Sequence, residues 1–281
     1  MKYCSLFLLF TIILGCTGSY REEQMQGILI KKKNIKPFYK DKQLWLSEFD
    51  SKDGSLARII QTIEKREWKQ SIQLARAYLK KQPFNKGCFL VLATSYAGLG
   101  KYEKASYYAK LVLKKFPTNV AAINILGLSI YAKAELLEDY RKAQRIFQLA
   151  FERSAKEVAA GLNLGYLLLE MGDTQTAQKI FIQTASRCGA CEEASLGYAI
   201  SLRRQGKHNL AKETLEKIVA NNPDFMTAWY QLALHYRNVE KNFEKSSQLI
   251  KKILDQSDMQ DIELVEKARM IWYANKENVV L

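Results

Sequence analysis

The residues with the clearest chemical potential are two cysteines in the tetrapeptide Cys188-Gly189-Ala190-Cys191. A thioredoxin-type dithiol needs a strand and a helix N-terminus to lower the pKa of one thiol, and no strand pattern precedes this pair. A structural zinc site needs four ligands, and the nearest other cysteine or histidine lies far along the chain. The alternatives are a short disulfide, two free thiols or a redox pair, and in an oxidising compartment we expect the disulfide.

Acid–base chemistry would have to use His208 or His235, because the sequence has 2 histidines. His208 lies in the polar stretch QGKHN, where we expect solvent exposure. His235 lies in LALHYRN, where we expect a structural or groove-lining role. We find no Ser/His/Asp or Cys/His arrangement with supporting spacing and no phosphate-binding glycine loop. The sequence therefore predicts no catalytic residue, no metal site and no cofactor.

The cysteine at position 16 indicates a different chemistry, which is attachment of lipid. Residues 1–15 combine Lys2, an apolar run and Gly15, the layout of a secretory signal, and the run is shorter than the about 20 residues that span a membrane. Ile13-Leu14-Gly15-Cys16 resembles the bacterial lipobox, although Leu14 is less usual there than a small residue. The resemblance implies cleavage before Cys16 and acylation of this residue, against the alternatives of an uncut signal anchor or a chance match.

Acylation would decide the location of the chain, because two or more acyl chains hold a protein on a membrane stably. Thr17 stands where an aspartate would favour inner-membrane retention, so the resemblance implies the periplasmic face of the outer membrane. Residues 16–50 would then form a basic tether, which either lies on anionic headgroups or is merely solvated. Alternatively, Leu44-Trp45-Leu46 packs on the folded part as an N-terminal cap. With Cys4 removed in the signal, Cys88 would remain as an unpaired, core-facing thiol.

The composition indicates a mostly folded chain. Its 281 residues include 48% hydrophobic residues, and the formal net charge is +14 with a pI of about 9.4. Such a charge suits nucleic acid, but that partner requires a cytoplasmic location, and export argues against it.

The spacing of the prolines indicates a repeat. Pro83 and Pro117 are 34 residues apart. Pro223 follows Pro117 after three further spans of 34 residues and 4 additional residues. Residues 88–117 contain two apolar helical periodicities separated by Gly100-Lys101-Tyr102, which predicts a helix hairpin. Small residues recur where two helices must approach closely: Ala93 and Ala105, Gly127 and Ala143, Gly165 and Ala177, Ala199 and Ala211, Ala233 and Ser246.

This pattern resembles the tetratricopeptide repeat (TPR) family. The resemblance implies an all-α, right-handed superhelical solenoid of about six helix hairpins in residues 51–260, followed by a capping helix and tail in residues 261–281. The third repeat is stretched by four residues around 134–139, and the first is degenerate at Ile59. The expected repeats are 52–85, 86–119, 120–157, 158–191, 192–225 and 226 to about 260.

In TPR proteins that bind peptides, the first helix of each hairpin lines a concave groove. Carried over to this chain, the resemblance implies exposed groove residues rich in tyrosine and asparagine, with an arginine-rich end suited to a carboxylate. These residues are Asn124, Leu128, Tyr131, Leu162, Asn163, Tyr166, Leu169, Leu196, Ile200, Arg203, Arg204, Tyr230 and Arg237.

Two functions fit these expectations. The first is a non-enzymatic, lipid-anchored scaffold that holds another envelope protein, similar in layout to the TPR lipoproteins of type IV pilus biogenesis or gliding motility. The second is an accessory factor of peptidoglycan or exported-polysaccharide enzymes that binds acidic ligands. High salt would discriminate between them, since binding through scattered lysines and arginines weakens as charges are screened.

Overall fold

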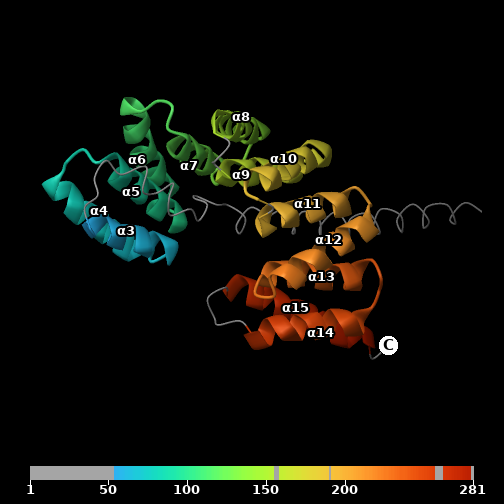
Figure 1. Ribbon diagram of the computed structural model, residues 1–281. Helices are drawn as coiled ribbons and strands as arrows, with labels where there is room; N and C mark the ends of the chain where they lie inside the picture. The colour runs from blue at the N-terminus through green and yellow to red at the C-terminus, as the bar shows by residue number, and fades with distance from the viewer. Residues whose placement is uncertain (1–53, 155–157, 190, 257–261, 280–281) are drawn as a thin grey trace, which may run out of the picture. The chain divides into compact units, whose positions relative to one another are not determined.

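The computed structural model describes residues 54–154, 158–189, 191–256 and 262–279 (Figure 1). The expected signal, Cys16 and the tether lie outside the described residues. The described part consists of helices and turns without a strand, which confirms the all-α fold class. The helices, labelled as in Figure 1, are α3 (Gly54–Glu64), α4 (Trp68–Lys81), α5 (Lys86–Gly98), α6 (Tyr102–Lys115), α7 (Val120–Tyr131), α8 (Leu137–Arg153), α9 (Val158–Glu170), α10 (Thr174–Arg187), α11 (Glu192–Arg204), α12 (His208–Asn221), α13 (Met226–Asn238), α14 (Phe243–Gln256) and α15 (Ile262–Val279).

The chain divides into two compact units, residues 1–173 and 174–281, which we call unit 1 and unit 2. In unit 1, α3/α4, α5/α6 and α7/α8 pack as hairpins, and α9 packs on α7 and α8. In unit 2, α10 packs on α11, α11/α12 and α13/α14 form hairpins, and α15 packs on α13 and α14. The boundary falls between α9 and α10, in the turn of the fourth predicted repeat.

Several turns between successive helices share one backbone feature. A residue with positive φ follows the helix before the turn, and after α5, α9 and α11 it is a glycine: Gly100 (φ 70°), Gly172 (φ 85°) and Gly206 (φ 76°), whereas the described turn between α7 and α8 has no such residue. Glycine tolerates this left-handed conformation because it lacks a Cβ atom. Arg66 (φ 58°) and Lys241 (φ 55°) take the same role in the first and last hairpins.

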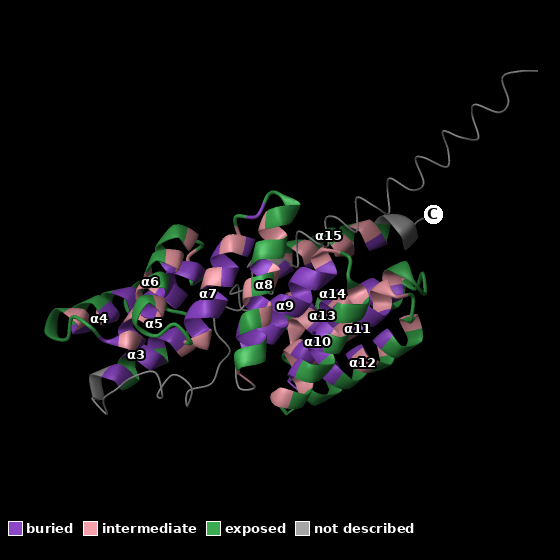
Figure 2. Ribbon diagram, turned by 90° about the horizontal axis from the view of Figure 1, so that it is seen from above, coloured by how far each residue is buried: buried purple, intermediate pink, exposed green. Residues whose placement is uncertain are grey.

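Close packing explains the recurrent small residues, all of which are buried. A Cβ atom on Gly127 in α7 would lie 2.9 Å from the ring of Phe147 in α8, and one on Gly197 in α11 would collide with the ring of Phe181 in α10. Helices whose large side chains fill the space between small ones can approach at core density. Figure 2 shows the result: α5, α7 and α9 are mostly buried, whereas the second helix of each pair keeps an exposed side.

The third hairpin absorbs its four extra residues in two places. The connection between α7 and α8 has five residues, where α5 and α6 are joined by three, and α8 has 17 residues against 14 in α6, whereas α7 is one residue shorter than α5 (12 against 13). The expected position, around residues 134–139, therefore covers only part of the insertion. The rest lengthens α8.

Helix α15 closes unit 2. Leu264 and Ala268 of α15 join a buried core with Tyr230 and Leu234 of α13 and Ile250 of α14, and Ile271 and Trp272 pack at its edge. A final hairpin would otherwise expose its apolar face. None of the helices in the described segments is both long and apolar enough to cross a membrane.

Candidate arginine-lined binding site

The candidate site lies in unit 2 and starts at the end of α11. This helix buries Ala199, Ile200 and Leu202 and ends at Arg203 and Arg204, both half-buried. Gly206 ends it, because its amide donates to the Arg203 carbonyl at 3.0 Å in a left-handed conformation. The carbonyls at a helix C-terminus carry partial negative charge and favour cations. The local sequence thus places two guanidinium groups at the end of a rigid helix.

Arg203 is the least compensated charge of the site. Within the described part of the chain its side chain makes no hydrogen bond and no ion pair. The pKa of Arg203 is lowered to about 10, first by burial and then by the positive charge of Arg204, while Tyr230 acts in the opposite direction. A partly desolvated cation without a counter-ion is unfavourable, and an anion bound beside it would relieve that cost.

Tyr230, on the second turn of α13, lies near Arg203 of α11 and Arg237 of α13. Its side chain is buried, and burial raises the pKa of Tyr230, whereas the positive charges of Arg203 and Arg237 lower it. Arg203 and Arg237 therefore both lie close enough to Tyr230 to act on it electrostatically. The phenol is neutral at pH 7 and can donate or accept a hydrogen bond.

Arg237 is held in place by the capping helix. Its Nε donates to Oδ1 of Asn275 in α15 at 2.9 Å, and its Nη1 lies 3.4 Å from Oδ1 of Asn238. Asn275 is 0% exposed, and its amide nitrogen donates to the Oγ atoms of Ser246 (3.0 Å) and Ser247 (3.1 Å) in α14. One buried amide thus connects three helices and fixes the orientation of a guanidinium whose protein partners are neutral.

Asn275 is not among the site residues that the sequence leads us to expect, because residues 261–281 are expected only to cap the array. One signal in the sequence nevertheless points to it. Asn275 follows Leu264, Ala268 and Ile271 at helical spacing and so falls on the apolar stripe that packs against unit 2. A polar residue on such a stripe has to be hydrogen-bonded inside the protein.

In unit 1, the expectation of exposed groove residues is wrong. All seven predicted positions there are buried, because α7 contacts α9 as well as α8, and these positions face neighbouring helices. They are Asn124, Leu128, Tyr131, Leu162, Asn163, Tyr166 and Leu169.

Two sets of hydrogen bonds show what these buried polar groups do. Asn163 Nδ2 donates to Asn124 Oδ1 at 3.0 Å, which joins α9 to α7. The hydroxyl of Tyr131 donates to Glu170, which also accepts from the hydroxyl of Tyr140 at 3.1 Å. Burial, followed by the charge of Glu170, raises the pKa of Tyr131. These side chains stabilise the packing of unit 1.

In unit 2, the expectation of exposed groove residues fails for three residues and holds in part for three arginines. Leu196, Ile200 and Tyr230 are buried, so their predicted exposure is also wrong. Arg203, Arg204 and Arg237 remain half-buried. The arginine-rich end of the predicted groove is therefore the part that keeps accessible polar groups, and its role in binding stays a prediction.

The two histidines meet, which their separation in sequence did not indicate. His208 is half-buried at the start of α12, not exposed as expected, and its ring centroid lies 6.5 Å from that of His235 in α13. His235 is 1% exposed, and its Nε2 lies 3.4 Å from Glu240, which also pairs with Lys212 at 2.6 Å. Burial lowers the pKa of His235, although Glu240 acts in the opposite direction. The described residues contain no group of three or more His, Cys, Asp or Glu side chains that could hold a metal ion.

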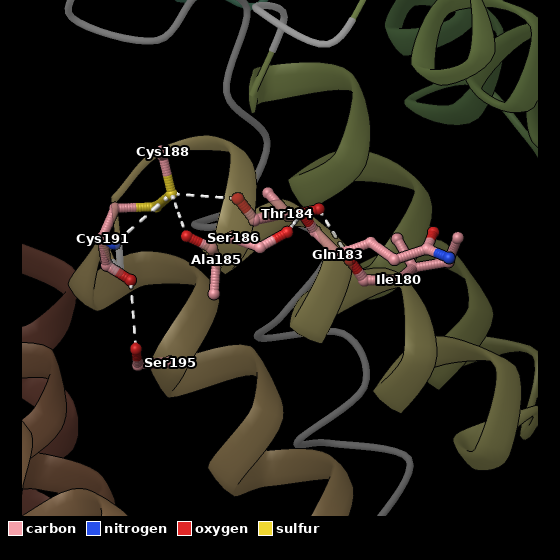
Figure 3. The surroundings of a disulfide bond; sticks show 8 residues. All are labelled: Ile180, Gln183, Thr184, Ala185, Ser186, Cys188, Cys191 and Ser195. Atoms are coloured by element: carbon pink, nitrogen blue, oxygen red, sulfur yellow. Dashed lines mark hydrogen bonds between the residues drawn. A yellow bond between two sulfur atoms is a disulfide. The ribbon is translucent and has the colours of Figure 1, made fainter.

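The three described cysteines differ in state. Cys188 and Cys191 form a disulfide between α10 and α11, with Cα atoms 5.6 Å apart (Figure 3). The Cys191 amide donates to the Cys188 sulfur at 3.3 Å, and Cys191 precedes the first turn of α11. Cys88 is a free thiol in the core, as expected, and burial raises the pKa of Cys88 to about 12.

Comparisons with known proteins identify the fold. Residues 196–260 match the tetratricopeptide repeat family. The chain is similar to the thermophilic TPR protein TTC0263 of Thermus thermophilus, with 17% identity, a TM-score of 0.58, and coverage of 64% of this chain and 96% of that one. It is also similar to PilF of Pseudomonas aeruginosa, with 15% identity, a TM-score of 0.53, and coverage of 68% and 88%. At such identities the likeness shows the fold alone. No curated protein matches the sequence. The chain therefore has the tetratricopeptide-repeat fold, which in other proteins serves as a scaffold for protein–protein interaction.

Proposed function

We propose that this protein is a binding scaffold of the bacterial cell envelope, and that unit 2 holds the acidic or C-terminal carboxylate end of a partner protein. The observation that carries the proposal is Arg203: a half-buried guanidinium without a counter-ion in the described residues, beside Arg204 and Tyr230. A carboxylate would supply the missing charge, and arginine can bind both of its oxygens.

The geometry favours an anionic group over an apolar one at this position. Arg237 also acts on Tyr230 electrostatically and is oriented by Asn275, so one phenol lies near two cations, of which Arg237 is held by a hydrogen bond. Because Tyr230 is buried and Arg237 is hydrogen-bonded to Asn275, these two groups lose little additional side-chain entropy on binding. An apolar stretch of the same partner would contact the neighbouring helices.

The location belongs to the same proposal. The lipobox-like residues Ile13 to Cys16 support acylation of Cys16 and attachment to the periplasmic face of the outer membrane. The resemblance of this layout to TPR lipoproteins of pilus biogenesis and gliding motility supports a role in the assembly of such a machine. The fold supports binding as the activity that we propose.

The test begins with capture of partners by the full chain in crosslinked cells and their identification. We expect Arg203→Glu/Arg204→Glu to lose the partner and the charge-matched control Lys179→Glu/Lys217→Glu, on exposed positions of α10 and α12, to retain it. Equal capture by both double variants would overturn the proposal.

A second measurement tests the chemistry of recognition. The C-terminal peptide of the captured partner is titrated with a free and with an amidated carboxyl group, against wild type and Arg203→Lys. A charge-assisted bond is worth about 1.5–3 kcal/mol, so we expect amidation to weaken binding about tenfold or more. Arg203→Lys keeps the charge but loses the two-pronged geometry, and we expect an intermediate affinity. Binding that survives amidation but falls steeply with salt would favour the acidic-polysaccharide alternative.

A further inference from the structure

A strongly basic surface in unit 1 is not used by the proposed function. Residues 68–119, which form α4, α5 and α6, contain ten lysines and arginines and one acidic residue, Glu103, and so carry +9 of the net charge of +14. Glu103 is itself paired with Lys133 at 2.8 Å. The single acidic residue of the segment is therefore already engaged by a lysine outside it.

Exposed aromatic rings lie among these charges. Phe84, before α5, is 69% exposed, Tyr107 of α6 is 59% exposed, and Phe116, after α6, is 42% exposed. We call the surface formed by Phe84, Tyr107, Lys110, Lys114, Lys115 and Phe116 the basic aromatic face. All six residues are exposed.

Ring contacts make this face continuous. Phe84 contacts Phe89 (6.2 Å between centroids), Phe89 contacts Tyr108 (6.2 Å), and Tyr108 contacts Tyr107 (5.2 Å). The Lys115 ammonium lies 3.3 Å from the centre of the Phe84 ring. Lys110 and Lys114 follow Tyr107 by three and seven residues, so they share its side of α6.

The chemistry of the face distinguishes between anionic partners. Lysine only donates hydrogen bonds, so the face offers phosphate groups many donors but offers sugar hydroxyls few acceptors. Lys115 lies over one face of the Phe84 ring, and Lys86 lies 5.3 Å from the ring of Phe116, so ammonium groups stand directly beside the exposed rings. Exposed phenylalanines beside lysines are suited to a headgroup region, where rings enter the acyl boundary and ammonium groups remain at the phosphates.

We propose that the basic aromatic face of unit 1 docks on an anionic lipid surface. Its lysines contact lipid phosphates, and Phe84 and Phe116 insert at the headgroup boundary. This contact is independent of acylation at Cys16 and of the arginines of unit 2. It would hold the α5/α6 hairpin at the membrane and so restrict which sides of unit 1 remain open to a protein.

The first experiment measures sedimentation of the full chain with vesicles of phosphatidylcholine alone or mixed with phosphatidylglycerol. Cys4→Ser and Cys16→Ser are present throughout, so that neither residue is acylated, and binding by residues 1–53 is common to all variants. Each basic residue at an anionic surface contributes about fivefold, so Lys110→Glu/Lys114→Glu should lower partitioning onto the mixed vesicles at least about thirtyfold. The control Lys179→Glu/Lys217→Glu has the same change of charge. Equal partitioning of these two variants would overturn the proposal.

The second experiment locates the contact. An environment-sensitive dye is attached at Gln82→Cys, next to Phe84, or at Asn209→Cys on α12, both exposed positions. In the Cys4→Ser/Cys16→Ser chain the introduced cysteine is the labelling site, since Cys88 is buried and Cys188 is bonded to Cys191. Mixed vesicles should shift the emission at position 82 to the blue and leave position 209 unchanged, and Phe84→Ser/Phe116→Ser should reduce the shift. The proposal fails if position 82 does not respond to vesicles, or if soluble polyglutamate or an oligonucleotide produces the same response.

Discussion

Replacement of Asn275 by alanine tests how the capping helix supports the candidate site. The side chain is fully buried and accepts from the charged Arg237 Nε at 2.9 Å while donating to Ser246 and Ser247. A hydrogen bond to a charged group is worth about 1.5–3 kcal/mol and a neutral one about 1 kcal/mol. The hydrogen bonds to Arg237, Ser246 and Ser247 all involve the amide of Asn275, so one substitution removes all three. We therefore expect Asn275→Ala to lower the free energy of unfolding of unit 2 by about 3 kcal/mol.

The assay is urea denaturation followed by tryptophan fluorescence, because Trp229 and Trp272 pack against the core that contains α15. Asn238→Ala is the control, since Asn238 is exposed and lies 3.4 Å from the same arginine, and we expect a change below about 0.5 kcal/mol. A double-mutant cycle of Asn275→Ala with Arg237→Met should give a coupling energy of about 1.5 kcal/mol or more. A loss below about 1 kcal/mol for Asn275→Ala, or a coupling energy near zero, would refute the view that this amide orients Arg237.

Three further predictions concern titratable groups and the disulfide. Cys88, with a pKa raised to about 12, should resist iodoacetamide at pH 8 until urea unfolds the chain; rapid labelling of the native protein would contradict its burial. Burial lowers the pKa of His235, so at acidic pH the unfolded state binds more protons than the folded state, and the free energy of unfolding should fall as the pH drops below 6.5. In urea titrations between pH 7 and 5, His235→Gln should make the free energy of unfolding depend less on pH. Cys188→Ala/Cys191→Ala should lower the free energy of unfolding by about 2 kcal/mol. A reductant should lower the wild-type value by the same amount and leave that of the variant unchanged.

The helix hairpins could be predicted from sequence because their signals are local and repeated. Small residues such as Gly127 and Ala143 recur at a fixed spacing, and glycines such as Gly100 and Gly206 mark the turns. Each signal reports on the helix pair that contains it. The pattern therefore predicts paired helices, and the described residues confirm the all-α fold class.

Exposure could not be predicted in the same way, because it depends on the neighbours of a hairpin. Asn124 and Asn163 are polar and lie on first helices, so the resemblance suggested a groove, yet they bond to each other between α7 and α9. Likewise His208 and His235 belong to different hairpins, and nothing in the stretch around either one indicates the other. Contacts between hairpins require the angle at which helices pack, which a single sequence does not contain.

The lengthened third hairpin is a suitable place to insert a tag. Its loop and α8 already accommodate four surplus positions while α5/α6 before it keeps the standard period, so a change of length there need not disturb the register of adjacent hairpins. Glu135 and Leu136 are both exposed in that loop. An epitope or fluorescent reporter inserted between them would label the protein while leaving every residue of the candidate site and of the basic aromatic face unchanged.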